Sequence, residues 1–503
     1  MTLRTKVNFK SGVLPIPIYT KPFPCGGHCI FCPREETSPN SYTDNEDTLF
    51  AKSVDFSSAM QFRRLLDRLP NTFKEKTYPF EIIILGGSFS ALTHDYRIKY
   101  ISDLYSQMSG INNIKIQKHK SGLNNHLCSI LTVESRPDQI DIEECRFLRS
   151  LGVSKVEIGV QHTSNDILIF NERGHDQDTV IRATKILKDE GFKVGYHIML
   201  GLPSSSYEDD YRMLSKTLWH PEYSPDYLKI YPCVLLKNKK LQPKLRAYYE
   251  MGNWIPLNNS QVIRLLEETI PFIPTYVRVS RVQRQFSDNI IECGVSSGVR
   301  NMIRNQIMDV RAREVGFSMK NALIDELAPM KHSISWNGRD GIIEIVGKEG
   351  ALLGITRIRD KNKDDLVIRE LRVFGKATAL GERGQIQGNG IGKLLLKKVE
   401  DIAVSNNKYR ILVNPAFGAK PYFINQGYTI ASDNMLEKNL ISKLSFSVNH
   451  SCKTEKDVKE RMRESESELS GRRGMTKRDV CAVERAGFRE WEKEQAERRV
   501  AEW

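Results

Sequence analysis

The sequence has no apolar run long enough to cross a bilayer, which takes about 20 residues, so we expect no membrane-spanning segment. Its first residues, MTLRTKVNFKSG, lack the apolar core of a secretory signal peptide. Cysteine is scarce, with nine in 503 residues, and an odd count does not suit a disulfide framework. These absences argue against membrane and secreted proteins, and we expect a cytoplasmic protein in a reducing compartment.

The charge balance is strongly basic. There are 75 Lys and Arg residues against 62 Asp and Glu residues, a formal net charge of +13. A polyanionic partner is therefore expected, with nucleic acid first, although a generally basic enzyme would show the same balance. A chain of this length is too long for one hydrophobic core and indicates two or three domains.

Three of the cysteines stand close together in KPFPCGGHCIFCPR, residues 21–34. Cys25, Cys29 and Cys32 have the spacing CxxxCxxC, and cysteine thiolates hold iron-sulfur clusters. Three thiolates can bind three irons of a cuboidal cluster and leave the fourth iron open for chemistry. Zinc is the alternative, with His28 as fourth ligand, but chelation by the adjacent His28 and Cys29 would be strained. The loop resembles that of radical S-adenosylmethionine (SAM) enzymes, whose reduced cluster splits SAM into a 5′-deoxyadenosyl radical.

The first 300 residues alternate short apolar runs with amphipathic segments. The helices expected include residues 55–69 and 178–190, and the strands expected are 81–85, 129–134, 155–160, 192–200, 227–232 and 276–283. Repeated strand and helix units of this kind predict an α/β fold with a parallel sheet or partial (β/α) barrel.

Polar residues stand at or just after the C-terminal part of several of these strands. They are Gly86, Gly87, Glu134, Arg136, Glu157, Gln161, His197, Lys229 and Tyr231. In parallel barrels this rim carries the chemistry. A structural hydrogen-bonding role is the alternative for each residue alone, as for His197 within an apolar strand. The pattern over five strands favours a functional site, in which Gly86 and Gly87 let the backbone approach SAM closely.

A second domain follows a basic helical connector. Runs at 341–347, 351–359 and 365–375 predict an antiparallel meander, and the glycine-rich turn QGNGIG, residues 387–392, leads into a helix. Such a turn presents free N–H groups and the positive end of the helix dipole, so it binds phosphate. The pattern resembles the pyrophosphate loop of GCN5-related N-acetyltransferases (GNAT), which hold acetyl-CoA. The segment at 421–428 fits the same family.

We expect four regions. Residues 1–300 form the radical SAM domain, 301–330 the connector, 331–445 the GNAT domain and 446–503 a tail. The tail is highly charged in mixed signs, so we expect solvated or peripheral helices there.

The combination of domains resembles the family of the Elongator catalytic subunit, a tRNA carboxymethyluridine synthase. The resemblance runs from about residue 4 to 438 and includes GGSF (86–89), EIGVQ (157–161), RVQR (281–284) and GIGKLLL (390–396). It implies a 4Fe-4S cluster and SAM as cofactors and acetyl-CoA as co-substrate, in one active site shared by the two domains.

The resemblance also implies the reaction. The deoxyadenosyl radical takes a hydrogen from the acetyl methyl, the carbon radical adds to C5 of a tRNA wobble uridine, and hydrolysis releases CoA. A tRNA partner accounts for the basic charge. Elongator-type subunits or a second copy of the chain are further candidate partners; neither DNA nor a membrane is expected.

The candidate site residues follow from the matches and positions. We expect Cys25, Cys29 and Cys32 to bind the cluster. The candidate cofactor-binding residues are Gly86, Gly87, Glu134, Arg136, Glu157 and Gln161 in the barrel, and Leu371, Arg372, Val373, Phe374, Gln387, Gly390, Ile391, Gly392, Lys393, Leu394 and Phe423 in the second domain. The candidate catalytic residues are Lys229, Tyr231 and Tyr422, and the candidate tRNA-binding residues are Arg281, Arg284, Arg311 and Arg313.

Two residues depart from the family pattern. Pro79 stands where the family has a lysine that contacts CoA, and Phe423 stands where a tyrosine usually protonates the leaving thiolate. The connector also lacks the zinc-binding cysteines of some members, so no zinc is expected. Two alternatives therefore stay open: a protein lysine acetyltransferase with a structural iron-sulfur domain, and a non-catalytic tRNA-binding relic.

Overall fold

The computed structural model describes residues 11–69, 79–111, 128–269, 273–283, 286–296, 298–303, 309–318, 331–347, 350–376, 378, 383–431 and 433–440. Arg284, most of the predicted connector and the whole of the predicted tail lie outside these residues. The predicted domain boundaries at 300, 330 and 445 therefore stay predictions. In the described part of the chain, no helix combines the length and apolarity needed to span a membrane.

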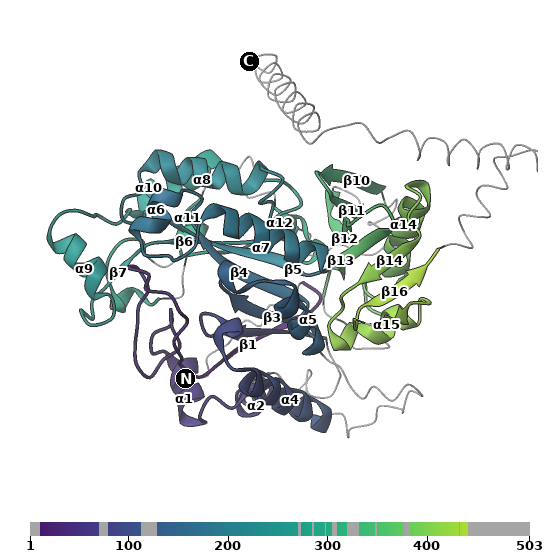
Figure 1. Cartoon of the computed structure of the whole chain (residues 1–503), viewed down its shortest axis with the longest axis horizontal. Coiled ribbons are helices and arrows are strands. Elements are labelled where there is room, and N and C mark those ends of the chain that lie inside the picture. Colours follow the sequence, from purple (N-terminus) through teal and green to yellow (C-terminus); the bar gives the residue numbers. More distant parts are fainter. Residues whose placement is uncertain are drawn as a thin grey trace, which may run out of the picture. The chain divides into compact units, whose positions relative to one another are not determined.

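The first sheet has seven strands, and every neighbouring pair runs parallel (Figure 1). Its order is β1 (Leu14–Tyr19), β2 (Phe80–Leu85), β3 (Cys128–Ser135), β4 (Lys155–Gln161), β5 (Lys193–Leu200), β6 (Tyr227–Pro232) and β8 (Arg278–Val282). The main helices of this half are α1 (Glu46–Ser53), α2 (Ser58–Asp67), α4 (His94–Ile111), α5 (Ile142–Ser150), α6 (Asn165–Phe170), α7 (Gln177–Asp189), α8 (Tyr207–Trp219), α9 (Pro243–Glu250) and α10 (Asn259–Thr269). Strand order that follows chain order, with helices between, is the arrangement that the sequence pattern predicts.

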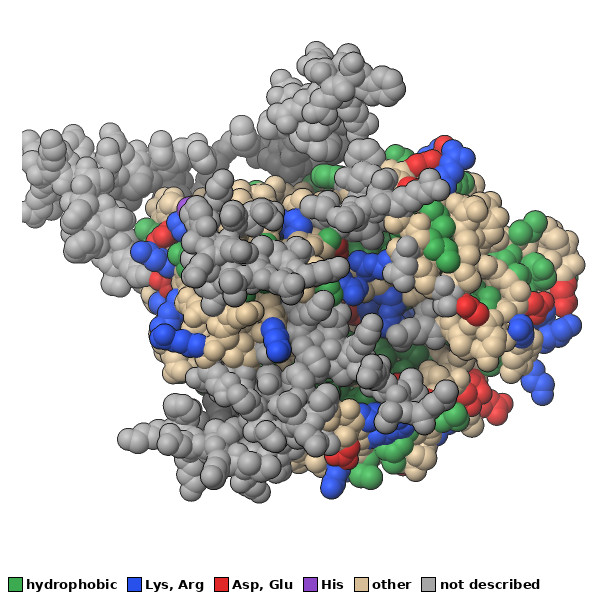
Figure 2. Space-filling view, turned by 180° about the vertical axis from the view of Figure 1, so that it is seen from behind, with side chains coloured by type: hydrophobic (Ala, Val, Ile, Leu, Met, Phe, Trp, Pro, Cys, Tyr) green, Lys and Arg blue, Asp and Glu red, His purple; other side chains and the backbone are tan. Residues whose placement is uncertain are grey.

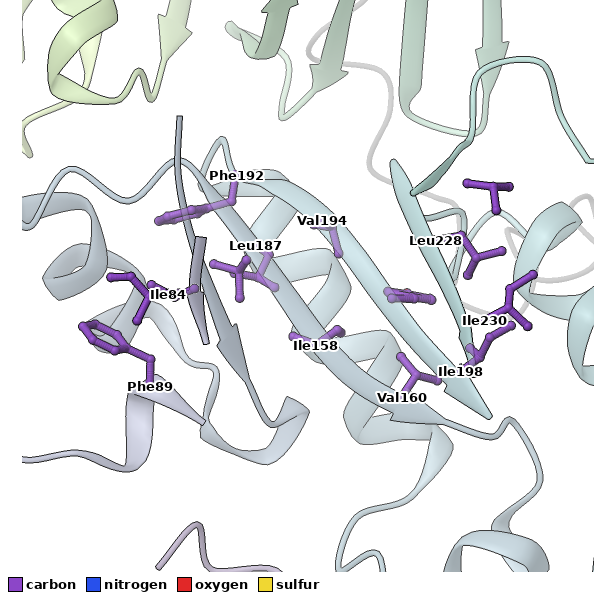
Figure 3. Close-up of a cluster of buried hydrophobic side chains, with 14 of the residues drawn as sticks. Ile84, Phe89, Ile158, Val160, Leu187, Phe192, Val194, Ile198, Leu228 and Ile230 are labelled. Carbon is purple, nitrogen blue, oxygen red and sulfur yellow. The ribbon is translucent and has the colours of Figure 1, made fainter. Parts of the chain in front are cut away.

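The main core lies between this sheet and its covering helices (Figure 3). Figure 3 shows Ile158, Val194 and Leu228, from three neighbouring strands, with Leu187 of α7. All four side chains have no exposed surface. Since successive strand residues point to opposite faces, these side chains occupy the outer face, and their alternate neighbours point into the barrel.

The inner face of the barrel is charged. Along β4, Lys155 and Glu157 alternate with Val156 and Ile158, and both charged residues are buried. Barrel interiors of this type are usually filled by branched aliphatic side chains. The outer face therefore supplies the hydrophobic core, while the inner face is left for polar chemistry.

The second sheet also has seven strands, and it is mixed. Its order is β10 (Lys331–Asn337), β11 (Asp340–Val346), β12 (Leu352–Asp360), β13 (Asp365–Val373), β14 (Arg410–Val413), β16 (Leu436–Asn439) and β15 (Thr429–Ile430). Only β13 and β14 pair in parallel, and α14 (Ile391–Ser405) lies between them in the chain. The short helix α15 (Lys420–Ile424) precedes β15. A separate ribbon joins β7 (Leu235–Leu236) to β9 (Ile291–Cys293).

Buried ion pairs join the two sheets. Asp226, just before β6, contacts Arg369 at 2.5 Å and Arg357 at 3.6 Å, both from the second sheet. Lys188 of α7 contacts Asp340 at 2.6 Å. These five side chains are at most 3% exposed, so each charge depends on its partners rather than on water.

The predicted fold class, a partial barrel of parallel strands followed by an α/β domain, is confirmed. Some local predictions were wrong or incomplete. The helix expected over 55–69 begins at Ser58, because Asp55 and Phe56 have positive φ and end α1 before α2 begins. The strands β1, β7, β9, β10, β14 and β16 were not predicted. Proline at two positions of β1 hid the first of these from a pattern search.

We predict that Asp226→Ala strongly destabilises the protein. The substitution leaves the buried guanidinium groups of Arg357 and Arg369 without a shared carboxylate, which costs about 3–5 kcal/mol. Urea unfolding should show this loss. The control is Asp103→Ala, which removes the exposed partner of Lys99 and should cost less than about 1 kcal/mol. Equal, small losses of unfolding free energy in both variants would contradict the view that the ion pairs of Asp226 between the two sheets are dehydrated.

Candidate active site

A first cavity of about 110 Å³ opens at the C-terminal ends of the barrel strands. The loop after β1 and the ends of β2 to β6 and β8 form its wall. The predicted residues that line it are Cys25, Cys29, Cys32, Gly87, Glu134, Arg136, Glu157, Gln161, His197, Tyr231 and Arg281. Residues from seven segments of the chain thus converge at this rim, as the sequence pattern predicts.

The three loop cysteines line this cavity, and none of them forms a disulfide bond with a described residue. Arg173 donates a hydrogen bond to the Cys29 sulfur over 3.3 Å, and the Cys32 sulfur lies 3.2 Å from the Ser41 hydroxyl. His28 is exposed and is not among the residues that line the cavity. Three converging thiols fit an iron-sulfur cluster with an open iron better than a four-ligand zinc site.

Glu134 is held by the glycine turn after β2. The N–H groups of Gly86 and Gly87 each lie 3.4 Å from its Oε2, and the Tyr42 hydroxyl donates to Oε1 over 2.9 Å. Both glycines have positive φ, 157° and 91°, a region that favours glycine. The turn therefore fixes a buried carboxylate at the cavity wall.

A buried charge network lies below this wall, inside the barrel. The Glu157 carboxylate contacts Lys155 at 3.0 Å and His197 at 3.0 Å, and it also binds Lys229. Burial raises the pKa of Glu157, but Lys155 and Lys229 outweigh it and hold that pKa well below its usual value. Burial, and then Lys229, lower the pKa of His197, so this imidazole is neutral at physiological pH.

The same network includes a set of possible metal ligands. Ligand atoms of Glu134, Glu157 and His197 all lie within 4.8 Å of one another. Because two lysines already neutralise Glu157, the set is better explained as an ion-paired network than as a metal centre.

A second cavity, of about 460 Å³, lies on the second sheet. Its opening exists because β13 and β14 pair only from Asp365 to Ile368 and then separate. The predicted residues that line it are Leu371, Arg372, Val373, Gln387, Gly390, Ile391, Gly392, Lys393, Tyr422 and Phe423. The N-terminus of α14 thus meets unpaired backbone of β13 in one hollow, a suitable place for a phosphate group with a long attached chain.

Tyr422 and Phe423 differ in what they offer to this cavity. The Tyr422 hydroxyl is buried and has no hydrogen-bond partner among the described residues. Burial raises the pKa of Tyr422 to about 12, so the phenol stays protonated. Phe423 is buried and offers only a ring edge to Tyr422 and Tyr428.

The barrel also contributes to the second cavity, but from its opposite end. Pro79, Ser129, Ile130 and Lys193 precede or begin strands β2, β3 and β5. Among the described residues, none lines both cavities, and the cavities lie at opposite ends of the parallel strands. From Lys193 to Met199 a strand spans about 20 Å. These residues therefore form two separate cavities, and the single shared active site that the resemblance implies stays a prediction.

Some predicted site residues lie outside both cavities. Phe374 and Leu394 line neither cavity. Gly86 and Lys229 do not line one either, but the Gly86 N–H bonds to Glu134 and Lys229 pairs with Glu157, and both carboxylates line the first cavity. Arg313 pairs with Glu344, and Arg311 lies over the Phe317 ring. Neither arginine lines the first cavity, so of the predicted tRNA-binding residues that the structure describes, only Arg281 does.

Sequence reasoning missed further residues that line the cavities, among them Tyr42, Arg173, Arg34 and Lys193. Tyr42 stands in SYT (41–43) and Arg173 in NERGH (171–175), two further segments of the family resemblance, and Arg34 lies two residues after the last cysteine of the loop. Lys193 begins a strand. Our search for polar residues at the C-terminal ends of strands could not find Lys193, because this residue lies at the N-terminal end of β5.

Comparisons with known proteins found relatives that are similar over most of this chain. The model of the radical SAM superfamily matches residues 24–215. A tRNA uridine(34) acetyltransferase from Dehalococcoides mccartyi is 30% identical over 453 residues, which are 84% of this chain and 97% of that protein. The enzyme of that name from Methanocaldococcus jannaschii is 31% identical and covers 83% of each chain. Human Elongator complex protein 3 is 26% identical over 85% of this chain and 84% of its own.

A solved structure is similar over nearly the same span. The archaeal Elp3 of Methanocaldococcus infernus, with an N-terminal deletion, aligns with a TM-score of 0.71 and 26% identity. The alignment covers 86% of this chain and all of that one.

We predict that Gly86→Ala distorts the first cavity. A Cβ at this position would lie 2.0 Å from the Thr20 hydroxyl oxygen, in a backbone conformation that alanine rarely adopts. The melting temperature should fall further than in Gly252→Ala, where φ is also positive but no atom lies within 4 Å of the added Cβ. Equal shifts in the two variants would show that the close approach to Thr20 is unimportant.

Proposed function

Because the chain belongs to the tRNA uridine(34) acetyltransferase family of radical SAM proteins, we propose that it modifies the wobble uridine of tRNA. The product would be 5-carboxymethyluridine, made from acetyl-CoA by SAM-derived radical chemistry. One observation carries the proposal: a single chain holds a cavity lined by three cysteines and a separate cavity lined by a glycine-rich turn at the N-terminus of a helix. Each corresponds to one of the two cofactor systems that the reaction needs.

The first cavity would hold the radical half of the reaction. Membership of the superfamily implies a 4Fe-4S cluster and SAM. Cys25, Cys29 and Cys32 would bind the cluster, and Gly87 and Glu134 would face SAM, with Gly86 supporting Glu134. When bound and reduced, the cluster supplies the electron that cleaves SAM to a 5′-deoxyadenosyl radical.

Buried ion pairs of the chain form the floor of this cavity. Inside the barrel, Glu157 pairs with Lys229 and shares Lys155 with Glu81, so the two lysines below the cavity face two carboxylates. The Tyr231 ring packs edge-on against His197, 5.4 Å between centroids, and limits the volume above this floor. A small cavity favours a radical step because it limits the access of water and side reactions.

The second cavity would hold acetyl-CoA. The N–H groups at Gly390, Ile391 and Gly392 begin α14 and would bind the pyrophosphate. The separated edge of β13 at Leu371, Arg372 and Val373 offers backbone groups for the pantetheine arm, since it pairs with β12 only along its other edge. Pro79 also lines this cavity, without the charge of the lysine it replaces.

The tRNA would approach the first cavity. Arg281 lines it, and Figure 2 shows further Lys and Arg side chains on one face of the molecule. The net charge of +13 supports a long phosphate backbone as partner. Elongator-type subunits are proposed as protein partners because several relatives are named Elongator complex protein 3.

The separation of the two cavities adds a requirement to the proposed reaction. The acetyl methyl has to reach the first cavity, although the cavities open at opposite ends of the barrel. A protein lysine acetyltransferase would not need that movement, so the test must distinguish the two functions.

The test is anaerobic incubation with SAM, dithionite, bulk tRNA and methyl-labelled acetyl-CoA. We expect 5′-deoxyadenosine together with label in 5-carboxymethyluridine, both measured by mass spectrometry of digested nucleosides. Cys29→Ala should abolish both products and the bound iron. Cys145→Ala, in a buried cysteine of α5 outside both cavities, should retain them.

Two outcomes would oppose the proposal. Label on protein lysines without deoxyadenosine would favour a lysine acetyltransferase. Neither product from iron-loaded protein would indicate a non-catalytic relic.

A further inference from the structure

Arg173 is a buried guanidinium group in the wall of the first cavity. Its residue is 7% exposed, and it lines the cavity together with Cys29. Each of its three nitrogens donates a hydrogen bond. Nε donates to the His175 ring over 3.0 Å, Nη2 to the Gly159 carbonyl over 2.5 Å, and Nη1 to the Cys29 sulfur over 3.3 Å. The guanidinium thus contacts one of the three candidate cluster ligands directly.

The positive charge of Arg173 has no carboxylate partner among the described residues. Burial, and then the charge of Arg173 itself, lower the pKa of His175 to about 4, so this imidazole is neutral at physiological pH. Glu172, the neighbour in the chain, pairs with Lys244 instead. Buried charges in proteins are normally paired, because an unpaired one is strongly unfavourable. The arrangement therefore suits an anionic group bound at the cysteines.

A second buried guanidinium faces the cysteine loop. Arg136 is 4% exposed and pairs with Asp138, but its Nη1 has no hydrogen-bond partner among the described residues. A Cβ added at Gly27 would lie 2.3 Å from this nitrogen and 3.5 Å from the Cys29 sulfur. Glycine at position 27 therefore leaves room for an unused N–H donor beside the sulfur. Such a donor fits a cluster, whose sulfur atoms accept hydrogen bonds.

The backbone fixes Arg173 relative to the cysteine loop. The Arg173 N–H donates to the Leu168 carbonyl of α6 over 2.9 Å, and Arg136 donates to the Arg173 carbonyl over 3.0 Å. The Ile30 N–H, next to Cys29, donates to the Asn171 carbonyl over 3.2 Å. The turn after α6 is thus bonded to the loop itself, so the contact between guanidinium and sulfur does not depend on the side chains alone.

We propose that Arg173 raises the reduction potential of the iron-sulfur cluster. The inference rests on the proposed function, in which Cys29 binds one iron of a 4Fe-4S cluster. Three thiolates give such a cluster a net negative charge. One electron from a low-potential donor adds a further negative charge, and no bond forms or breaks. The potential depends on net charge and on hydrogen bonds to the sulfur atoms. A buried cation that donates to the Cys29 thiolate stabilises the reduced form more than the oxidised form.

This role suits the setting of the first cavity. The proposed reaction needs an electron at the cluster before SAM is cleaved, and a small cavity leaves little water to stabilise the added charge. Arg173 provides that stabilisation as a fixed charge within the wall. Arg34 also lines the cavity, but it is exposed, so water and salt screen its charge.

The experiment measures the reduction potential of the full chain after cluster reconstitution, without SAM or tRNA. The protein is titrated anaerobically with redox mediators, and the reduced cluster is followed by electron paramagnetic resonance. In Arg173→Met, the ratio of reduced to oxidised cluster at a given solution potential should fall at least about tenfold, a shift of about 59 mV for one electron. The matched control is Arg182→Met, an exposed arginine of α7 outside both cavities, which should keep the wild-type potential.

Two further variants separate the charge from the hydrogen bond. Arg173→Gln keeps an N–H donor and removes the charge, whereas Arg173→Lys keeps the charge on a group without the planar fork. Both should have potentials between those of the wild type and Arg173→Met. They also allow the measurement if the methionine variant does not hold its cluster.

The outcomes distinguish the two proposals. Wild-type potentials in the iron-loaded Arg173 variants would overturn the redox role, and so would weaker SAM binding as their only defect, because Arg173 would then be a ligand of SAM. Loss of iron from all three variants, with iron retained in Arg182→Met, would show a structural role and would also overturn it. A wild type that binds no cluster, or whose reduced cluster does not cleave SAM, would instead overturn the proposed function.

Discussion

The structure depends on charges that are buried in pairs. Inside the barrel, Glu157 pairs with Lys155 and Lys229, and between the sheets Asp226 pairs with Arg357 and Arg369. Each carboxylate serves more than one cation, so the removal of one carboxylate weakens the compensation of two buried positive charges at once. The hydrophobic faces hold each sheet and its helices together, but these pairs set how the barrel and the second sheet meet.

The same pairing makes the exception meaningful. Lys193 lies in this region of compensated charge without a partner of its own among the described residues, and it borders the second cavity. A lone buried charge lowers stability, and natural proteins retain such groups mainly where function needs them.

Much of the fold was predictable from local patterns. Apolar alternation identified β2 to β6 and β8, because their outer faces pack on helices and must be apolar. The break between α1 and α2 was not predicted, because the residue types of Asp55 and Phe56 do not show that both have positive φ. Among the candidate site residues, the cysteine loop and QGNGIG were visible because their ligand chemistry needs fixed spacing. The pair of Arg313 with Glu344 could not be foreseen, because residue type alone does not show which carboxylate an arginine meets, and its role in tRNA binding stays a prediction.

The sequence by itself determined the chemical groups available to the chain: three closely spaced thiols, a glycine-rich turn at the start of a helix and a net positive charge. These are local properties, carried by residues a few positions apart. Only the tertiary structure decided that the two cavities open at opposite ends of the barrel and that Lys193 borders the second. Burial and distance between segments far apart in the chain arise from packing, and no short stretch of sequence encodes them.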